Sequence, residues 1–288
     1  MKLTVGYLYP SVMSQYGDRG NVITVLERCR RRGIEAEVCP LELGDPVDPD
    51  RVDLLLVGGG ADTHQQLIWE DLVGVKGEGI RRAVDEGAAV FAVCAGYQLS
   101  GHYYRTAWGQ ELPGLGIFDA HTVHRAAQTG TKLDSITDAG SVRAVGNLVV
   151  EWHPEGPDGN GKGRDGSGEA ASQRLLVGFE NHGGRTYLRS GAQPLGRVLT
   201  GGGNNSEDGW EGCHHRNAIG TYLHGPALPK NPDLADHLIS TALSRRYGNV
   251  RLQALDDGPE VAAHDRAVTR ALTRPAWWQR WVPGQGVA

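Results

Sequence analysis

Cys94 and His224 are the two residues whose surroundings best suit nucleophilic chemistry. Cys94 follows the apolar run Ala88–Val93 and precedes Ala95-Gly96-Tyr97-Gln98, which predicts a buried strand, a tight bend and then a helix. This order is typical of a nucleophile elbow, with sulfur in place of the usual serine oxygen. The N–H groups and dipole of a helix N-terminus favour a thiolate. A cysteine that only fills the core is the alternative, because cysteine is among the most buried residue types.

His224 ends the β-rich run Ala218–Leu223 and precedes the turn Gly225-Pro226. A thiol nucleophile needs a base within hydrogen-bond reach that later protonates the leaving group, and histidine performs both tasks near neutral pH. The chain contains 11 histidines, and most histidines have structural or surface roles. Spacing alone therefore does not pair His224 with Cys94.

The elements that must position these residues alternate between strand and helix before Cys94. Apolar runs predict strands at 3–9, 34–41, 52–57 and 88–93, while amphipathic spacing predicts helices at 21–32 and 62–86, the second broken around Gly74 and Gly77. We expect Asn21 to cap the first helix and its arginine run 28–32 to be a solvated face. Such βα units predict a parallel sheet with ligands at the carboxyl ends of its strands, where Gly58-Gly59-Gly60 and Cys94 fall.

The second half of the chain has a different pattern of predicted elements. Short β-like pieces between residues 114 and 200 predict an antiparallel layer attached to the parallel core. Residues 153–173, rich in glycine and aspartate, are expected to form a flexible insertion. Helices are predicted at 234–247 and 259–272, before a tail that contains Trp277, Trp278 and Trp281.

Composition excludes several classes of function. The chain has 288 residues, 39% of them hydrophobic, and a net charge of −5, which favours neither nucleic acid nor an anionic membrane as a partner. We expect no signal peptide, because Met1–Val5 is already strand-like and lacks a long apolar region, and no transmembrane segment, because no apolar run is long enough. The 4 scattered cysteines form no C-x-x-C pair, and we expect a cytoplasmic protein with free thiols. The clusters His121/His124 and Cys213-His214-His215 do not match a closed zinc site, so no metal is expected.

Several separated motifs carry a resemblance to a known family. The run Cys94-Ala95-Gly96-Tyr97-Gln98 matches the C-x-G-x-Q elbow of class I glutamine amidotransferases, and Gly58–Gly60 is placed like their oxyanion loop. The run Gly220–Gly225 is similar to the cobyric-acid-synthase branch of that family. Three stretches resemble the GatD family, the glutaminase subunits of lipid II isoglutaminyl synthase: Tyr16–Asn21, Phe179–Tyr187, and Gly220–Pro226 with Leu228–Asn231.

The resemblance implies a fold and a domain division. It implies an α/β class I glutamine-amidotransferase-like fold, with a parallel core sheet flanked by helices and an antiparallel β extension. Residues 1–250 would form the glutamine amidotransferase domain, including the insertion at 153–173. Residues 251–288 would form a C-terminal helical extension and tail.

The resemblance also implies roles for single residues. Cys94 would attack the side-chain amide of glutamine, and His224 would activate the thiol and protonate the departing ammonia. The N–H groups of Ala95 and of the Gly59/Gly60 loop would hold the oxyanion. By position, Arg143 matches the family's glutamine-binding arginine, and a guanidinium suits the α-carboxylate. Gln98 would help to shape the pocket.

One departure concerns the third member of the triad. Many class I members carry a glutamate two residues after the histidine, and here that position is Pro226. We therefore expect a Cys–His dyad, with Glu180, Asp18 or a backbone carbonyl as alternatives for orienting His224.

A separate synthetase is implied as the partner, because no G-x-x-x-x-G-K-[ST] loop for ATP occurs in this chain. The resemblance implies a heterodimer with a MurT-like Mur-ligase-family subunit that binds ATP and Mg and amidates the D-glutamate α-carboxyl of lipid II in peptidoglycan synthesis. No cofactor is expected in this chain, and the complex would work near the inner face of the membrane. The alternatives are a glutaminase for another amidation (cobyrinate-like), a cysteine hydrolase acting on small peptides, and a non-catalytic partner subunit.

Overall fold

The computed structural model describes all of the 288 residues except 15–16, 132–142, 153, 155–173 and 274–288. The predicted insertion at 153–173, apart from Pro154, and the tail with its three tryptophans lie outside the described residues. Within the described part, no helix is long and apolar enough to cross a membrane.

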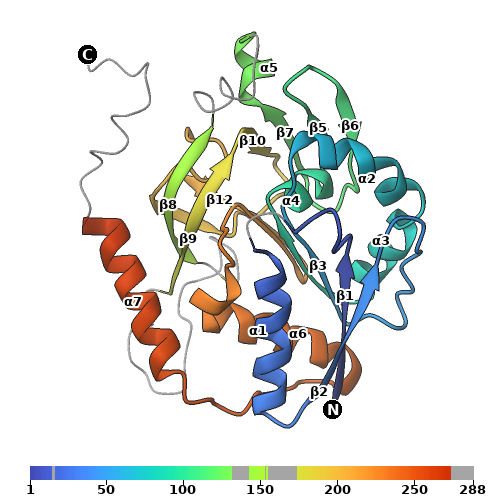
Figure 1. The fold of residues 1–288 in the computed structure, drawn as a ribbon, viewed down its shortest axis with the longest axis vertical. Helices are drawn as coiled ribbons and strands as arrows, with labels where there is room; N and C mark the ends of the chain where they lie inside the picture. Colours follow the sequence, from blue (N-terminus) through green and yellow to red (C-terminus); the bar gives the residue numbers. More distant parts are fainter. Residues whose placement is uncertain (15–16, 132–142, 153, 155–173, 274–288) are drawn as a thin grey trace.

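A six-stranded sheet forms the centre of the molecule, in the order β13-β14-β4-β3-β1-β2 (Figure 1). All neighbours are parallel except β13, which pairs antiparallel with β14. The short strands β3 and β4 consist wholly of buried residues, because helices cover both faces of the sheet. The predicted parallel core is confirmed. The strands are β1 (Lys2–Leu8), β2 (Glu35–Leu41), β3 (Leu54–Val57), β4 (Ala89–Val93), β13 (Cys213–His215) and β14 (Ala218–Thr221).

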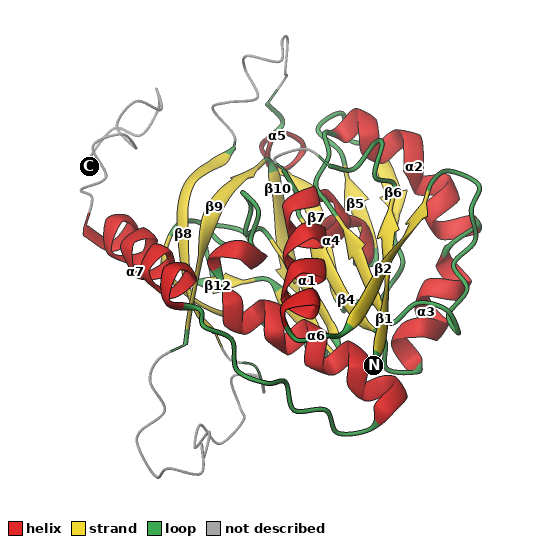
Figure 2. Cartoon of the chain, turned by 60° about the horizontal axis from the view of Figure 1, so that its bottom comes forward, coloured by secondary structure: helices red, strands yellow, loops and turns green. Residues whose placement is uncertain are grey.

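Helices pack on the two faces of this sheet (Figures 1 and 2). Helix α6 contacts α1 and strands β1, β3 and β4, whereas α2 contacts α3 and α4. The predicted break between the helices at 62–86 is confirmed, but the predicted cap is wrong, because Asn21 lies inside α1 and accepts a hydrogen bond from Leu228. The helices are α1 (Arg19–Arg31), α2 (Asp62–Gly74), α3 (Gly77–Asp85), α4 (Ala95–Ser100) and α6 (Pro232–Tyr247), with the 3-10 turn η2 (Leu228–Lys230) before α6.

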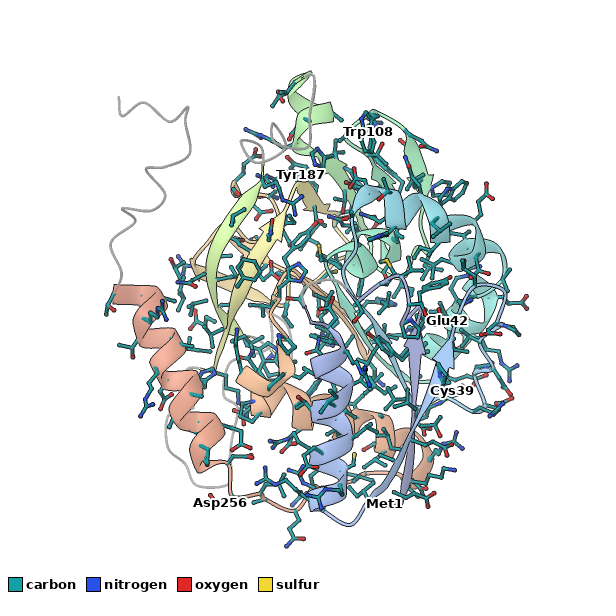
Figure 3. All side chains as sticks on the ribbon, in the orientation of Figure 1. Met1, Cys39, Glu42, Trp108, Tyr187 and Asp256 are labelled. Carbon is teal, nitrogen blue, oxygen red and sulfur yellow. The ribbon has the colours of Figure 1, made fainter. Side chains whose placement is uncertain are left out.

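Two four-stranded sheets form the predicted β extension, in the orders β10-β7-β5-β6 and β12-β11-β8-β9. All of their pairs are antiparallel except β5 with β7. Trp108 and Tyr187 mark the end of the molecule formed by the first of these sheets, opposite Met1 (Figure 3). The elements are β5 (Tyr103–Arg105), β6 (Glu111–Pro113), β7 (Ala120–His124), α5 (Arg125–Thr129), β8 (Ala144–Trp152), β9 (Leu175–His182), β10 (Gly184–Leu188), β11 (Gly196–Thr200) and β12 (Trp210–Glu211).

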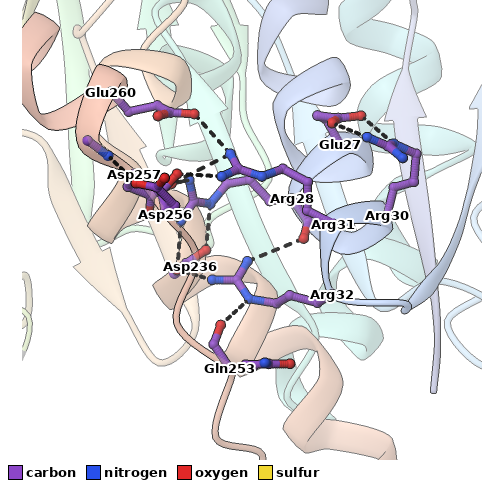
Figure 4. Close-up of polar contacts among 11 residues, drawn as sticks. Glu27, Arg28, Arg30, Arg31, Arg32, Asp236, Gln253, Asp256, Asp257 and Glu260 are labelled. Atoms are coloured by element: carbon purple, nitrogen blue, oxygen red, sulfur yellow. Dashed lines mark hydrogen bonds and ion pairs between the residues drawn. The ribbon is translucent and has the colours of Figure 1, made fainter.

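Helix α7 (Gly258–Thr273) packs against β8 and β9 (Figure 2). Val149, Val177 and Ala271 form a small apolar cluster there. The residues before α7 are held by arginines of α1 (Figure 4). Arg28 binds both Asp236 and Asp257.

The expectation that the arginine run is a solvated face is wrong for its two most buried members. The side chains of Arg28 and Arg32 are only 5% and 2% exposed, whereas that of Arg30 is 73% exposed. Arg32 donates to Asp236 and to the Gln253 carbonyl (Figure 4). The carboxylates that bury Arg28 come from more than 200 residues along the chain, so the local pattern contains no sign of them.

Candidate active site

Four loops meet at the carboxyl ends of neighbouring strands. Because the strand order is β14-β4-β3-β1, the residues that follow these strands share one edge of the sheet. They include His224 after β14, Cys94 after β4, Gly59 after β3 and Asp18 in the loop after β1. The sheet thus gathers residues that are up to 206 positions apart in the sequence, counted from Asp18 to His224.

Cys94 occupies the predicted elbow between β4 and α4. Its φ of +52° and ψ of −105° lie outside the regions that non-glycine residues normally adopt. Its N–H donates to the Thr221 carbonyl at 2.9 Å, which joins the elbow to the strand that leads to His224. Gly96 lets α4 approach β3, since a Cβ there would stand 2.7 Å from Val57 Cγ1. The backbone is therefore held in a strained turn at the cysteine.

Gly59 marks the point where Cys94 and His224 come together. A Cβ on Gly59 would stand 3.0 Å from His224 Cε1 and 3.4 Å from Cys94 Cβ. Both side chains thus border the same small space, and both are buried. The structure brings the two predicted reactive residues to one site, beside the loop that contains Gly60.

The electrostatics of this space favour the neutral forms of both groups. Burial raises the pKa of the Cys94 thiol to about 12, against the lowering effects of Arg143 and the Ala95 N–H. Burial, with smaller contributions from His182 and Arg143, lowers the pKa of His224 to about 3. The expected thiolate at the helix N-terminus is therefore outweighed by desolvation. A neutral imidazole beside a neutral thiol can act as general base at the moment of attack.

Arg143 lies just before β8, half-buried and close enough to lower the pKa of Cys94. Its Nε donates to Asn181 Oδ1 at 2.7 Å and its Nη2 donates to the Asn181 carbonyl at 2.6 Å. Asn181 thus orients the guanidinium of Arg143 by accepting hydrogen bonds from two of the five N–H donors of that group. Asn181 belongs to a motif that the sequence singled out, but its role as the support of Arg143 was missed.

Gln98 lies on the inner side of α4 and is buried. Its Oε1 accepts from Gln65 Nε2 at 2.9 Å, and its Nε2 donates to the Tyr222 hydroxyl at 3.2 Å. The Tyr222 hydroxyl also lies 2.7 Å from Thr186 Oγ1. Gln98 therefore braces the wall of the site through Tyr222, two residues before His224.

The two carboxylates considered for orienting His224 both have other partners. Glu180 accepts the N–H groups of Gly202 and Gly203 at 2.6 and 3.0 Å, and its Oε2 lies 3.6 Å from His182 Nε2. His182 stacks on Tyr222 with ring centroids 3.6 Å apart. Asp18 Oδ2 accepts the Gly59 N–H at 2.7 Å.

The loop after His224 packs against Gly17, in the loop before α1, and against the first turn of α1. Gly17 and Gly20 face the ring of Pro226, and a Cβ on Gly20 would clash with that ring. Asn21 Oδ1 accepts the Leu228 N–H at 2.9 Å. Two motifs that the sequence presents separately thus form one contact beside the site.

Comparison with known proteins agrees with this geometry. The family of CobB/CobQ-like glutamine amidotransferase domains matches residues 4–232. The GatD subunit of the glutamine-hydrolysing lipid II isoglutaminyl synthase of Staphylococcus aureus is 33% identical over 270 residues, which cover 94% of this chain and 96% of that protein. The GatD subunit of Streptococcus pneumoniae is 34% identical over 257 residues, which cover 89% and 86%.

More distant relatives share only part of their length with this chain. The cobyric acid synthase of Pelotomaculum thermopropionicum is 29% identical over 201 residues, which cover 67% of this chain and 33% of that protein. The family match spans most of the chain, and the similarity to the two GatD subunits spans nearly all of it. The chain therefore belongs to the CobB/CobQ-like glutamine amidotransferases, in the branch of the GatD subunits.

Proposed function

We propose that this chain is the glutaminase subunit of a lipid II isoglutaminyl synthase and that it hydrolyses L-glutamine through Cys94 and His224. The observation that carries the proposal is the meeting of the strained Cys94 elbow and the His224 ring around Gly59. The reaction class follows from a thiol nucleophile next to a neutral imidazole.

The reaction would begin when Cys94 Sγ attacks the side-chain amide carbon of glutamine while His224 takes the thiol proton. The tetrahedral intermediate collapses as His224 returns that proton to the nitrogen, and ammonia leaves a thioester. Water then attacks the thioester, again with His224 as base, and glutamate is released with the thiol restored. The Ala95 N–H stands next to the sulfur for the oxyanion, and the loop of Gly59 and Gly60 borders the same space.

Substrate glutamine would be held by Arg143. Asn181 fixes the guanidinium through two hydrogen bonds, and the charge lies close enough to Cys94 to act on its pKa. A carboxylate that binds this guanidinium places an amino acid with its head group near Arg143 and its side chain toward Cys94. Gln98 would support this pocket through Tyr222.

The ammonia would be used by a partner. The names of the relatives describe a lipid II isoglutaminyl synthase of which GatD is one subunit. We infer a heterodimer with a MurT-like synthetase that binds ATP and Mg and amidates the D-glutamate α-carboxyl of lipid II. Such a complex would work in the cytoplasm at the inner face of the membrane, where ATP and a lipid-linked substrate are both present.

The test is glutamate release from glutamine by the purified chain, alone and with its synthetase. Cys94→Ala is expected to lower the rate by about 1,000-fold or more, because covalent catalysis is lost. Cys39→Ala, which removes a partly exposed thiol of the edge strand β2, is the matched control and should leave the rate unchanged. Equal rates for Cys94→Ala and the wild type in the presence of the synthetase would refute the glutaminase.

The lipid II assignment needs its own measurement. The wild-type complex should amidate lipid II with glutamine as the nitrogen source. The complex with Cys94→Ala should do so only when ammonium chloride is supplied. Failure of the wild-type complex with both nitrogen sources would refute the lipid II assignment and leave the glutaminase standing.

A further inference from the structure

The Gly59 N–H is directed at Asp18 and not toward Cys94. Asp18 Oδ2 accepts this N–H at 2.7 Å, inside the space that Cys94 and His224 border. A Cβ on Gly59 would stand 3.5 Å from the same Oδ2, 3.4 Å from Cys94 Cβ and 3.0 Å from His224 Cε1. The carboxylate therefore holds a backbone donor of the β3 loop that borders Cys94.

The side chain of Asp18 lies beside Gly59, although its position in the chain would allow it to cap helix α1. It stands at the N-cap of α1, where aspartate commonly accepts a hydrogen bond from the first turn of the helix. Its side chain makes no such bond. The carboxylate is only 3% exposed, and among the described residues Oδ1 has no hydrogen-bond partner. Among the described residues this buried carboxylate has one oxygen unsatisfied, which is unfavourable for the fold and argues against a purely structural role.

The surrounding loops fix this arrangement. A Cβ on Gly58 would stand 2.8 Å from Asp18 Cβ, so the β3 loop packs directly against Asp18. The chain on the other side of Asp18 is tied to the loop after His224 through Gly20 against Pro226 and through Asn21 with Leu228. A movement of that loop would therefore act on Asp18 directly.

The contact opposes the chemistry in two ways. An N–H that donates to a carboxylate is not available to an oxyanion, and one such donor is worth about 100- to 1,000-fold in kcat. The negative charge of Asp18 also raises the pKa of the Cys94 thiol. The first effect disappears when the carboxylate releases the Gly59 N–H, and the second weakens only when the carboxylate also moves away from the sulfur.

We propose that Asp18 is a positioning residue that closes the oxyanion hole of the uncomplexed subunit by holding the Gly59 N–H. Glutamine hydrolysis then requires that this hydrogen bond be broken, so that the N–H turns to the oxyanion on the acyl carbon bound to Cys94. The inference rests on the proposed glutaminase function. It implies that the subunit hydrolyses little glutamine until the loop of Asp18 shifts, which protects glutamine from loss when no acceptor for ammonia is present.

Two substitutions separate the effect of the charge from the effect of the hydrogen bond. Asp18→Asn removes the charge but keeps a carbonyl that can accept the Gly59 N–H, whereas Asp18→Ala removes both. Since burial raises the pKa of Asp18 to about 7, the neutral side chains should leave the protein folded. Asp50→Ala, which removes an exposed carboxylate, controls for the change in net charge.

The first readout is the rate at which iodoacetamide alkylates Cys94, which requires no glutamine. At about pH 8.5, above the raised pKa of Asp18 (about 7), both Asp18 variants should react about 3- to 10-fold faster than the wild type, because a negative charge near the thiol has been removed. Asp50→Ala should match the wild type. Wild-type alkylation rates in both Asp18 variants would overturn the inference whatever the glutaminase activity.

The second readout is glutamine hydrolysis by the isolated subunit. Asp18→Ala should exceed Asp18→Asn in kcat by about 3- to 10-fold, the strength of one neutral hydrogen bond, with KM unchanged. Equal kcat values for the two variants, or values for Asp18→Ala below the wild type, would overturn the inference. An Asp18→Ala subunit that stays inactive alone while the wild-type complex is active would overturn it as well.

The failure of the proposed function has a different signature. If the wild-type complex with its synthetase releases no glutamate from glutamine, the glutaminase is refuted and the inference falls with it. If the complex is active and only the comparison of the Asp18 variants fails, the glutaminase stands and the role of Asp18 is refuted alone.

Discussion

Glu211 is expected to make the stability of the protein depend on pH, and Glu211→Gln should remove that dependence. The side chain is fully buried. Its Oε1 accepts from Thr221 Oγ1 and from the Tyr222 N–H, both at 2.7 Å, on the segment that leads to His224. Burial raises the pKa of Glu211 from 4.5 to about 7, against the lowering effect of these two hydrogen bonds.

The sign and size of the effect follow from this shift. A carboxyl whose pKa is higher in the folded state binds its proton more tightly there, so its contribution favours folding at low pH. That contribution is lost as the pH rises from 4.5 to about 7. Integration between pH 5 and pH 8 gives a loss of about 2.5 kcal/mol in the free energy of unfolding. Glutamine at this position keeps an acceptor oxygen and does not titrate.

The assay is denaturant unfolding of the wild type and Glu211→Gln at pH 5 and pH 8. The difference between the two proteins should shift by about 2.5 kcal/mol in favour of Glu211→Gln at the higher pH. Effects of all other titrating groups cancel in this double difference. Glu35→Gln, at a side chain that is 72% exposed, is the control and should shift by less than about 0.5 kcal/mol. A shift below that value for Glu211→Gln, or one of opposite sign, would refute the reasoning.

Two further substitutions test the site and the C-terminal attachment. Arg143→Lys keeps the positive charge but loses the planar fork, so KM for glutamine should rise about 10-fold or more in steady-state assays. Unchanged KM would contradict a carboxylate at Arg143. Arg28→Met should lower the free energy of unfolding by about 2–3 kcal/mol, because Asp236 and Asp257 lose a buried partner but stay partly exposed. Arg30→Met is its matched control at an exposed pair and should cost about 0.5 kcal/mol or less.

The sequence predicted correctly those parts of the fold that are determined by residues close together in the chain. The apolar run before Cys94 specifies a buried strand, and the small residues after it permit the elbow, so the position of Cys94 followed from its neighbours. The alternation of strands and helices gave the parallel core for the same reason. Gly74 and Gly77 flank the break between α2 and α3 as predicted.

The parts that sequence could not predict depend on contacts between distant segments. Arg28 looks like any exposed helix arginine until Asp236 and Asp257 are brought to it by α6 and the segment before α7. The direction of the Gly59 N–H is equally invisible, because it depends on the arrival of Asp18 from 41 residues away. The predicted oxyanion loop was thus placed beside Cys94 from sequence, whereas the partner of its N–H required the structure.

Pro226 occupies the position where many class I members carry the triad glutamate, and it contacts the motif at the start of α1. One contact therefore accounts for both features. The ring of Pro226 fills the space that a side chain at Gly20 would need. Pro226 thereby joins the turn after His224 to the segment around Gly20. A carboxylate at this position would have to give up that contact in order to face the imidazole. Of the carboxylates that act on the pKa of Cys94, Asp18 has the largest effect, and it lies between Gly17 and Gly20, which face Pro226. In this chain, the turn after His224 therefore joins the proposed catalytic base to the segment of Asp18, which in our proposal controls the Gly59 N–H.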